Sequence, residues 1–259
     1  MTSDCRKTNS LHFCPAGESF MTELEERWRK VLDGKAEAER AAGLAIGSVR
    51  LVAVSKFHPA SAIAELYGLG QRDFGENYMQ EARAKQDELS GLGIRWHAIG
   101  AVQSNKAKDV AGRFHLLHTL ASESLARALV RRLPDGLSQD VLLQINIGRE
   151  PQKSGLMPED AERFIASLQS EGLLCNGEGG QGLRIRGLMC IPPRCGEGEE
   201  ARPFFVAMRN LRDRLASASG IDLPELSMGM SGDYRQAVAE GATMIRVGTD
   251  IFGARPVKA

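Results

Sequence analysis

The sequence predicts an α/β protein that folds as a single (β/α)8 barrel of the TIM type, with one extra helix before the first strand. Apolar runs of strand length alternate with helical stretches eight times along the chain of 259 residues. Such alternation indicates a parallel sheet, and eight repeats are the number that closes a barrel. A doubly wound open sheet is the alternative, but no GxGxxG motif follows the first strand.

Apolar spacing predicts each element of the N-terminal half. Residues 18–42 are highly charged with apolar residues at helical spacing, which is typical of an amphipathic helix. Pro59 marks the start of a helix, and Ser122 is expected to act as the N-cap of another. We expect strands over 51–56, 72–75, 95–100 and 114–118, and helices over 62–68, 78–89, 104–111 and 122–132.

The C-terminal half continues the same alternation. We expect strands over 140–147, 185–191, 225–230 and 243–247, and helices over 158–170, 201–219 and 231–240. Gly241 is expected to end the last of these helices, and the glycine-rich residues 172–182 predict a mobile loop. Residues 1–17 are polar and are predicted to form a disordered leader, so residues 18–259 form the single barrel domain.

Composition argues against several classes of function. The 33 Lys and Arg residues balance 33 Asp and Glu residues, so neither a nucleic-acid-binding surface nor a polybasic membrane anchor is indicated. No apolar run has the length of a transmembrane helix. Five cysteines without CxxC spacing argue against a metal site, and although Cys190 and Cys195 flank a Pro-Pro turn, reduced thiols in the cytoplasm are the expectation.

Lys56 directly follows the apolar first strand. In a barrel, functional side chains gather at the C-terminal ends of the strands. A lysine at the mouth of a core has a lowered pKa because burial disfavours its charged form, and such an amine forms Schiff bases with carbonyls. A side chain that extends into solvent is the alternative. The other predicted strand ends contribute Glu76, Asn77, His97, His118, Asn146, Met189, Ile191, Met230, Ser231, Arg246, Gly248 and Thr249.

The last two strand ends indicate a phosphate site. Ser231 is expected to open a helix, whose free N–H groups and dipole attract anions. Gly248 permits close backbone approach and Thr249 supplies a hydroxyl, although an N-cap and a tight turn are the alternatives. Phosphate sites after strands seven and eight recur in such barrels. Because the first and eighth strands are neighbours, Lys56 and this site together fit an aldehyde that carries a phosphate, as pyridoxal 5'-phosphate (PLP) does.

Seven segments of the chain resemble the pyridoxal phosphate homeostasis proteins of the YggS/PROSC type. They are VAVSK (52–56), FGENYMQEA (74–82), WHAIGAVQSNK (96–106), QINIGREPQKSG (144–155), RGLMCIPP (186–193), LSMGMSGD (226–233) and IRVGTDIFGAR (245–255). The resemblance implies a single barrel, similar to the N-terminal domain of alanine racemase, that binds PLP. The residues it assigns to the cofactor are Lys56 as the Schiff base, Asn77 near the ring, Arg246 at the ring nitrogen, and Ser231, Gly248 and Thr249 at the phosphate.

Arg246 bears on whether such a protein is an enzyme. An arginine donates hydrogen bonds but keeps its own proton, so the ring nitrogen would stay unprotonated. That weak electron sink suits a racemase, and equally a protein that only holds the cofactor. A salt bridge from Arg246 to Glu225 or Asp250 is the alternative role.

A racemase also needs a second base. His97 and His118 are the candidates, with hydrogen-bonded core positions as the alternative. The three tyrosines, Tyr67, Tyr78 and Tyr234, fall on predicted helices.

The prediction is therefore a cytoplasmic PLP carrier, expected to be a monomer, that stores and delivers PLP and limits its free concentration, without catalytic residues. PLP-dependent apo-enzymes are the candidate partners, and Lys106, Lys153 and Lys258 are candidate secondary acceptors of PLP. A one-domain amino-acid racemase is the alternative. A third interpretation is an aldolase that uses Lys56 on a sugar phosphate.

Overall fold

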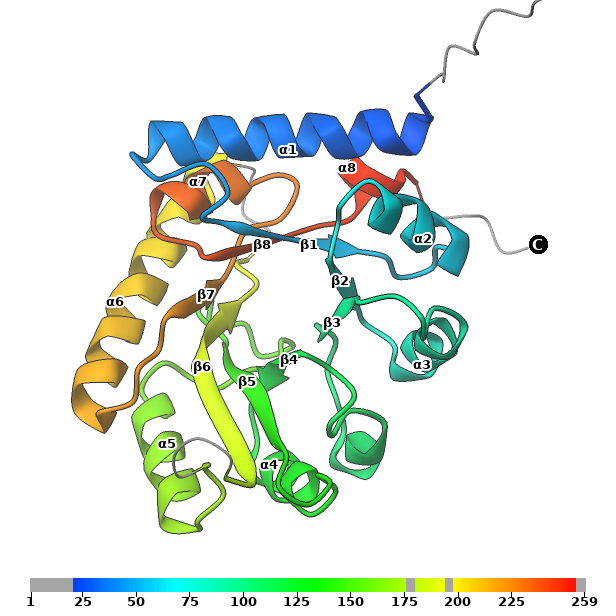
Figure 1. Ribbon diagram of the computed structural model, residues 1–259. Coiled ribbons are helices and arrows are strands. Elements are labelled where there is room, and N and C mark those ends of the chain that lie inside the picture. The colour runs from blue at the N-terminus through cyan, green and yellow to red at the C-terminus, as the bar shows by residue number, and fades with distance from the viewer. Residues whose placement is uncertain (1–20, 176–179, 194–197, 255–259) are drawn as a thin grey trace, which may run out of the picture.

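Eight parallel strands close into a barrel in which every strand pairs with its neighbours in sequence order (Figure 1). The computed structural model describes residues 21–175, 180–193 and 198–254. The barrel closes where β1 pairs with β8, with Val52 beside Arg246 and Ala53 beside Val247. The predicted barrel is confirmed, whereas the predicted leader over 1–17 lies outside the described residues.

The elements alternate along the chain as predicted. The strands are β1 (Arg50–Val54), β2 (Asp73–Glu76), β3 (Arg95–Ala98), β4 (Leu116–Leu120), β5 (Ser138–Ile145), β6 (Gly182–Cys190), β7 (Glu225–Ser227) and β8 (Met244–Val247). The helices are α1 (Glu23–Ala41), α2 (Ala60–Gly68), α3 (Met79–Glu88), α4 (Glu123–Val130), α5 (Ala161–Ser170), α6 (Arg202–Ser219), α7 (Tyr234–Ala239) and α8 (Thr249–Phe252), with 3₁₀ turns η1 (Ser104–Asp109) and η2 (Gly198–Ala201).

Four boundaries differ from the predictions in ways that matter. The helix expected over 104–111 is the short 3₁₀ turn η1. Strand β4 is shifted by two residues, which places His118 in the middle of the strand. Helix α7 begins at Tyr234 and not at Ser231. Strand β6 begins at Gly182, and residues 176–179 of the predicted glycine-rich loop lie outside the described residues.

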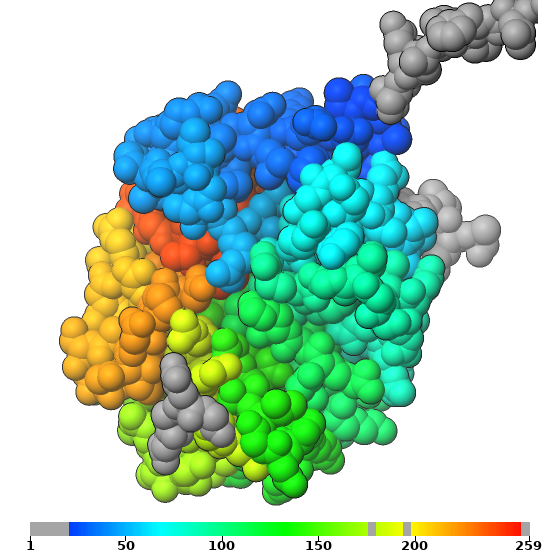
Figure 2. All heavy atoms as spheres, in the orientation of Figure 1, coloured from blue at the N-terminus to red at the C-terminus, as the bar shows by residue number. Residues whose placement is uncertain are grey.

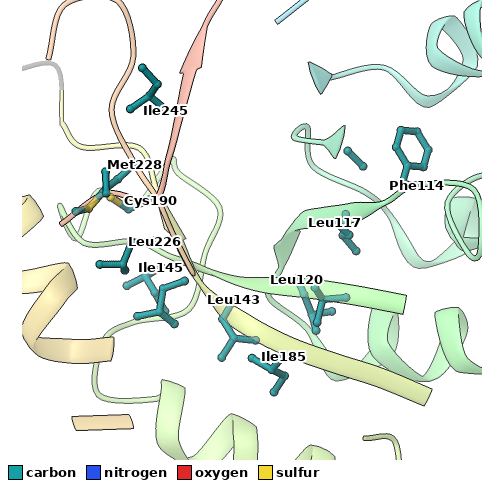
Figure 3. Packing of buried hydrophobic residues seen from close by; sticks show 14 of the residues in the cluster. Phe114, Leu117, Leu120, Leu143, Ile145, Ile185, Cys190, Leu226, Met228 and Ile245 are labelled. Carbon is teal, nitrogen blue, oxygen red and sulfur yellow. The ribbon is translucent and has the colours of Figure 1, made fainter. Parts of the chain in front are cut away.

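Alternation along the strands divides the buried residues into two layers. Outward-facing side chains pack under the helices, and Figure 3 shows part of this layer on β4 to β8, including Leu120, Leu143 and Ile185. Inside the barrel, a small apolar cluster contains Val52, Leu116, Leu142, Met189 and Met244. The next inward positions along β3, β4, β7 and β8 are polar, which is unusual for a core.

Helix α1 lies across the seam where the barrel closes. It packs against α7 and α8, and the space-filling view shows its atoms against those of the last elements (Figures 1 and 2). Arg27 Nε donates to the backbone oxygen of Ile251 at 2.9 Å. Gly34 is needed on this face because a Cβ there would lie 2.3 Å from the Tyr234 hydroxyl oxygen.

The described ranges contain neither a membrane-spanning helix nor a cluster of metal-ligating side chains. No helix there is long and apolar enough to cross a membrane. No group of three or more His, Cys, Asp or Glu side chains in the same ranges is placed to hold a metal ion. Cys190 is a buried free thiol, and Cys195 lies outside the described residues.

Candidate ligand-binding site at the barrel mouth

All six residues predicted to hold a ligand line one cavity of about 390 Å³ at the C-terminal ends of the strands. This volume lies within the range of roughly 300–1,000 Å³ that is common for small-molecule sites. The ends of β1 and β2 contribute one side of the cavity, and the ends of β7 and β8 contribute the adjoining side. The six residues are Lys56, Asn77, Ser231, Arg246, Gly248 and Thr249.

Lys56 lies in a turn just after β1 and is half-buried. The next residue, Phe57, has a φ of 69°, a left-handed conformation that is uncommon outside glycine. Its backbone N–H donates to Glu81 Oε1 at 2.6 Å. On the other side of the turn, Lys85 Nζ donates to the backbone oxygen of Ser55 at 2.8 Å. The backbone on both sides of Lys56 is therefore anchored to α3.

A buried group of charges supports this turn from below. Lys85 Nζ lies 2.6 Å from Glu76 Oε1 and 2.7 Å from Glu81 Oε1. Ser55 Oγ also donates to Glu76 Oε1, at 2.7 Å. Burial raises the pKa of Glu76, while the bonds from Lys85 and Ser55 act in the opposite direction. The sequence does not predict this cluster, because nothing in the charged residues 78–89 distinguishes a buried lysine from an exposed one.

The β7–β8 side of the cavity is built differently. Ser231 and Gly232 form a turn before α7, so the prediction that Ser231 opens the helix was wrong. The cause is local, since the Asp233 carboxylate accepts a hydrogen bond from the Met230 N–H at 2.6 Å and holds the chain in a turn. Helix α7 spans six residues. The donors on this side are therefore those of two turns and not those of a long helix.

Several of these donors have no acceptor within the described part of the chain. They are the backbone N–H groups of Ser231, Gly232, Gly248 and Thr249, and the hydroxyls of Ser231 and Thr249. Gly248 brings this segment close to β1, because a Cβ there would lie 3.2 Å from the Val54 oxygen. A set of unpaired donors at a cavity edge is a receptor for an anion.

Arg246 projects from β8 and is 4% exposed. Its Nη1 donates to Ser227 Oγ at 2.7 Å and its Nη2 donates to the Cys190 backbone oxygen at 2.9 Å. The alternative of a salt bridge to Glu225 or Asp250 was wrong, since Glu225 pairs with Arg50 and no carboxylate among the described residues pairs with Arg246. Burial lowers the pKa of Arg246.

His97 and His118 do not reach the cavity. Both are fully buried inside the barrel, in the middle of their strands and not at the ends. The interpretation as hydrogen-bonded core residues fits, because the two rings contact each other, Nδ1 of His97 lying 2.9 Å from Nε2 of His118. Burial lowers the pKa of both imidazoles. They are not placed to act as a base on a ligand.

The cavity contains one residue that the sequence did not predict, His58, and one predicted residue, Asn77, with an oxygen, unpaired in the described part of the chain, that was not predicted. His58 lines the wall, and its ring stacks on Phe252 with centroids 5.0 Å apart. Burial lowers the pKa of His58. Asn77 was predicted, but its Oδ1 is a buried oxygen without a hydrogen-bond partner in the described ranges, which indicates that a donor is expected there. Nothing in the sequence around His58 distinguishes it from a loop histidine.

The remaining predicted strand-end residues have structural roles. Asn146 organises the loop after β5, its Nδ2 donating to the Glu150 backbone oxygen at 2.9 Å. Met189 packs inside the barrel. Among the candidate secondary lysines, Lys153 donates to the Pro192 backbone oxygen, Lys106 is exposed on η1, and Lys258 lies outside the described residues.

The arrangement can bind a small anion at two points. Lys56 on the β1 side and a set of N–H and hydroxyl donors on the β7–β8 side line the same cavity, and the buried guanidinium of Arg246 bonds to residues of β6 and β7. A ligand with an electrophilic carbon at one end and a phosphate at the other matches both groups.

Comparison with known proteins finds relatives that match nearly the whole chain. The family model described as alanine racemase, N-terminal domain, matches residues 35–256. The pyridoxal phosphate homeostasis protein of Pseudomonas aeruginosa is 41% identical over 236 residues, which cover 91% of this chain and 97% of that protein. The protein of the same description from Aquifex aeolicus is 38% identical, covering 89% and 97%. The structure of PipY from Synechococcus elongatus with PLP bound is 40% identical, with a TM-score of 0.74, covering 89% of this chain and 100% of that chain.

Proposed function

Because the chain belongs to the pyridoxal phosphate homeostasis proteins, within the alanine racemase N-terminal domain family, we propose that it binds PLP covalently on Lys56 and serves in PLP homeostasis. The observation that carries the proposal is the convergence of Lys56, Arg246 and a set of unpaired donors on one cavity. PipY, a relative with a structure of the same fold, is described with PLP bound.

The cavity residues divide between the two ends of the ligand. PLP supplies an aldehyde on an electron-withdrawing ring. Lys56 Nζ would form the C=N bond with the aldehyde carbon, and the aldehyde oxygen leaves as water. Arg246 keeps its proton at neutral pH despite burial, so it would donate to the ring nitrogen and leave that nitrogen unprotonated. Asn77, whose Oδ1 is buried and without a partner in the described ranges, would lie near the ring.

The phosphate would be held by the β7–β8 side. Ser231 and Thr249 each offer a hydroxyl and a backbone N–H, and Gly248 adds a further N–H. Hydrogen bonds from neutral donors to an ionised phosphate are about twice as strong as those between neutral groups. The two turns therefore supply most of the recognition of the charged end.

We further propose that the protein is a carrier without a turnover reaction, located in the cytoplasm. It would store PLP, limit free aldehyde and release PLP to apo-enzymes when water or another amine attacks the C=N bond. Its support is that His97 and His118 lie away from the cavity. The racemase alternative retains one supporting observation, because His58 lines the cavity wall and could exchange a proton.

Reduction with borohydride followed by peptide mass spectrometry tests this proposal. Wild-type protein incubated with PLP should show a visible absorption band and, after reduction, a phosphopyridoxyl adduct at Lys56. Lys56→Ala should lose both, whereas Lys106→Ala, which changes an exposed lysine, should keep both. A wild-type protein that stays colourless with added PLP would overturn the proposal. Deuterium incorporation into alanine or serine in deuterated water would favour the racemase alternative.

A further inference from the structure

A continuous line of hydrogen bonds crosses the barrel interior from Arg246 to Asp73. Arg246 Nη1 lies 2.7 Å from Ser227 Oγ, which lies 2.9 Å from His118 Nδ1. His118 Nε2 then lies 2.9 Å from His97 Nδ1, and His97 Nε2 lies 2.9 Å from Asp73 Oδ1. The three inner members are 0% exposed, and the two ends are 4% exposed. Strands β2, β3, β4, β7 and β8 each contribute one member.

The two ends of this line of hydrogen bonds determine where its protons lie. Arg246 can only donate, so Ser227 Oγ accepts from it. Asp73 is ionised, since its hydrogen bonds with Arg95 and His97 lower its pKa despite burial, so it only accepts, and His97 carries its proton on Nε2. A neutral His97 then accepts at Nδ1 from His118 Nε2–H. Neutral His118 in turn accepts at Nδ1 from the Ser227 hydroxyl, and every donor points from Arg246 toward Asp73.

This arrangement leaves the charge of Arg246 directed at the cavity. Its two hydrogen-bond acceptors are a hydroxyl and a backbone oxygen, so no carboxylate among the described residues bonds to it directly, although the charge of Asp233 acts on it through space. Two fixed bonds define the plane of the guanidinium, and its remaining N–H groups stay available on the cavity side. Apolar side chains fill the neighbouring interior positions, so packing alone does not require these polar groups.

We propose that Ser227, His118, His97 and Asp73 are positioning residues that hold Arg246 in the orientation in which it meets the ligand ring. This role rests on the proposed PLP function. None of the four contacts the cavity, so they act only through Arg246. All hydrogen bonds in this line are donated in one direction. PLP binding should therefore tolerate a substitution that preserves that direction and weaken with one that removes it.

His118 offers a matched pair of substitutions. In His118→Gln, the amide oxygen can accept from Ser227 while the amide NH₂ donates to His97, so the direction is kept. His118→Leu removes both bonds, and Ser227→Ala removes the link to Arg246 with a smaller change of volume. We expect PLP affinity, measured by titration of the visible band, to fall about tenfold in His118→Leu and Ser227→Ala. In His118→Gln the PLP affinity should stay close to that of wild type. The same is expected of His115→Gln, which changes a neighbouring histidine outside this line of hydrogen bonds.

Histidine ¹⁵N spectra of the protein without PLP test this line of hydrogen bonds independently. Both His97 and His118 should carry the proton on Nε2 at neutral pH, with a scalar coupling across the N–H···N bond between them. Protonation of Nδ1 on either ring would overturn the inference. It would also fall if wild type binds PLP and folded Ser227→Ala binds it equally well. Failure of the wild type to bind PLP would instead overturn the proposed function, and with it the role proposed for this line of hydrogen bonds.

Discussion

The two sides of the cavity are constructed on opposite principles. On the β1–β2 side, Glu81 and Lys85 anchor the backbone around Lys56, and the buried charges are bonded to one another. On the β7–β8 side, the backbone N–H groups of Ser231 and Gly248 have no acceptor within the described ranges. The backbone that carries Lys56 is thus fixed before a ligand arrives, whereas the donors of the β7–β8 side would be paired only by the proposed ligand. Substitutions on the first side should change stability, and those on the second should change affinity.

The largest effect is expected from Lys85→Met. This change leaves Glu76 buried without its cation, and removing one partner of a buried ion pair costs about 3–5 kcal/mol. Denaturant unfolding followed by circular dichroism measures the loss. Adding Glu76→Gln to Lys85→Met should restore part of the stability, because no buried charge is then left unpaired. A loss below about 1 kcal/mol, the value typical of exposed pairs, would contradict the picture of a pre-built side.

The pH dependence of the same variant has a defined sign. Burial raises the pKa of Glu76 above its ordinary value, so the folded protein binds this proton more tightly than the unfolded chain does. Glu76 therefore stabilises the folded protein increasingly as pH falls through the raised pKa, and this stabilisation is lost as pH rises. Without Lys85 the pKa of Glu76 should rise further, and the stability gap between wild type and Lys85→Met should narrow as pH falls from neutral toward the ordinary pKa of a glutamate.

An intermediate effect, confined to affinity, is expected on the other side. Ser231→Ala and Thr249→Ala should each weaken PLP binding about tenfold, since each removes a hydroxyl donor to an ionised phosphate. Pyridoxal, which lacks the phosphate, should bind to both variants as it does to wild type. Ser124→Ala, at an exposed position of α4, serves as the control. Equal losses for PLP and pyridoxal would show that these hydroxyls do not meet the phosphate.

The smallest effect is expected from Glu81→Gln. An amide oxygen can still accept from the Phe57 N–H, but it no longer carries the charge that pairs with Lys85. We expect a stability loss of about 1 kcal/mol and a slower reaction of Lys56 with PLP, measured by stopped-flow absorbance. An unchanged rate would mean that the strained turn at Phe57 does not depend on this carboxylate.

The fold and the outline of the cavity follow from the sequence because both depend on repetition. Strand-helix alternation predicts the barrel, and the barrel brings Lys56 and Arg246 to the same mouth. That these residues hold PLP stays a prediction. Residues whose role depends on strand phase were not predictable, since His97 and His118 face each other only in the actual register of β3 and β4. The burial of Lys85 also required tertiary contacts, because the charged sequence of α3 is typical of a surface helix.

The position of α1 has a consequence for synthesis of the chain. Trp28 and Val31 on α1 are buried, and the helix packs against α7 and α8, which are made more than 190 residues later. Contacts between such distant segments form late in folding. Lys56 emerges early, but the donors from Ser231 to Thr249 emerge last. A nascent chain therefore cannot assemble the cavity, and we expect only completed chains to withdraw reactive aldehyde from the cell.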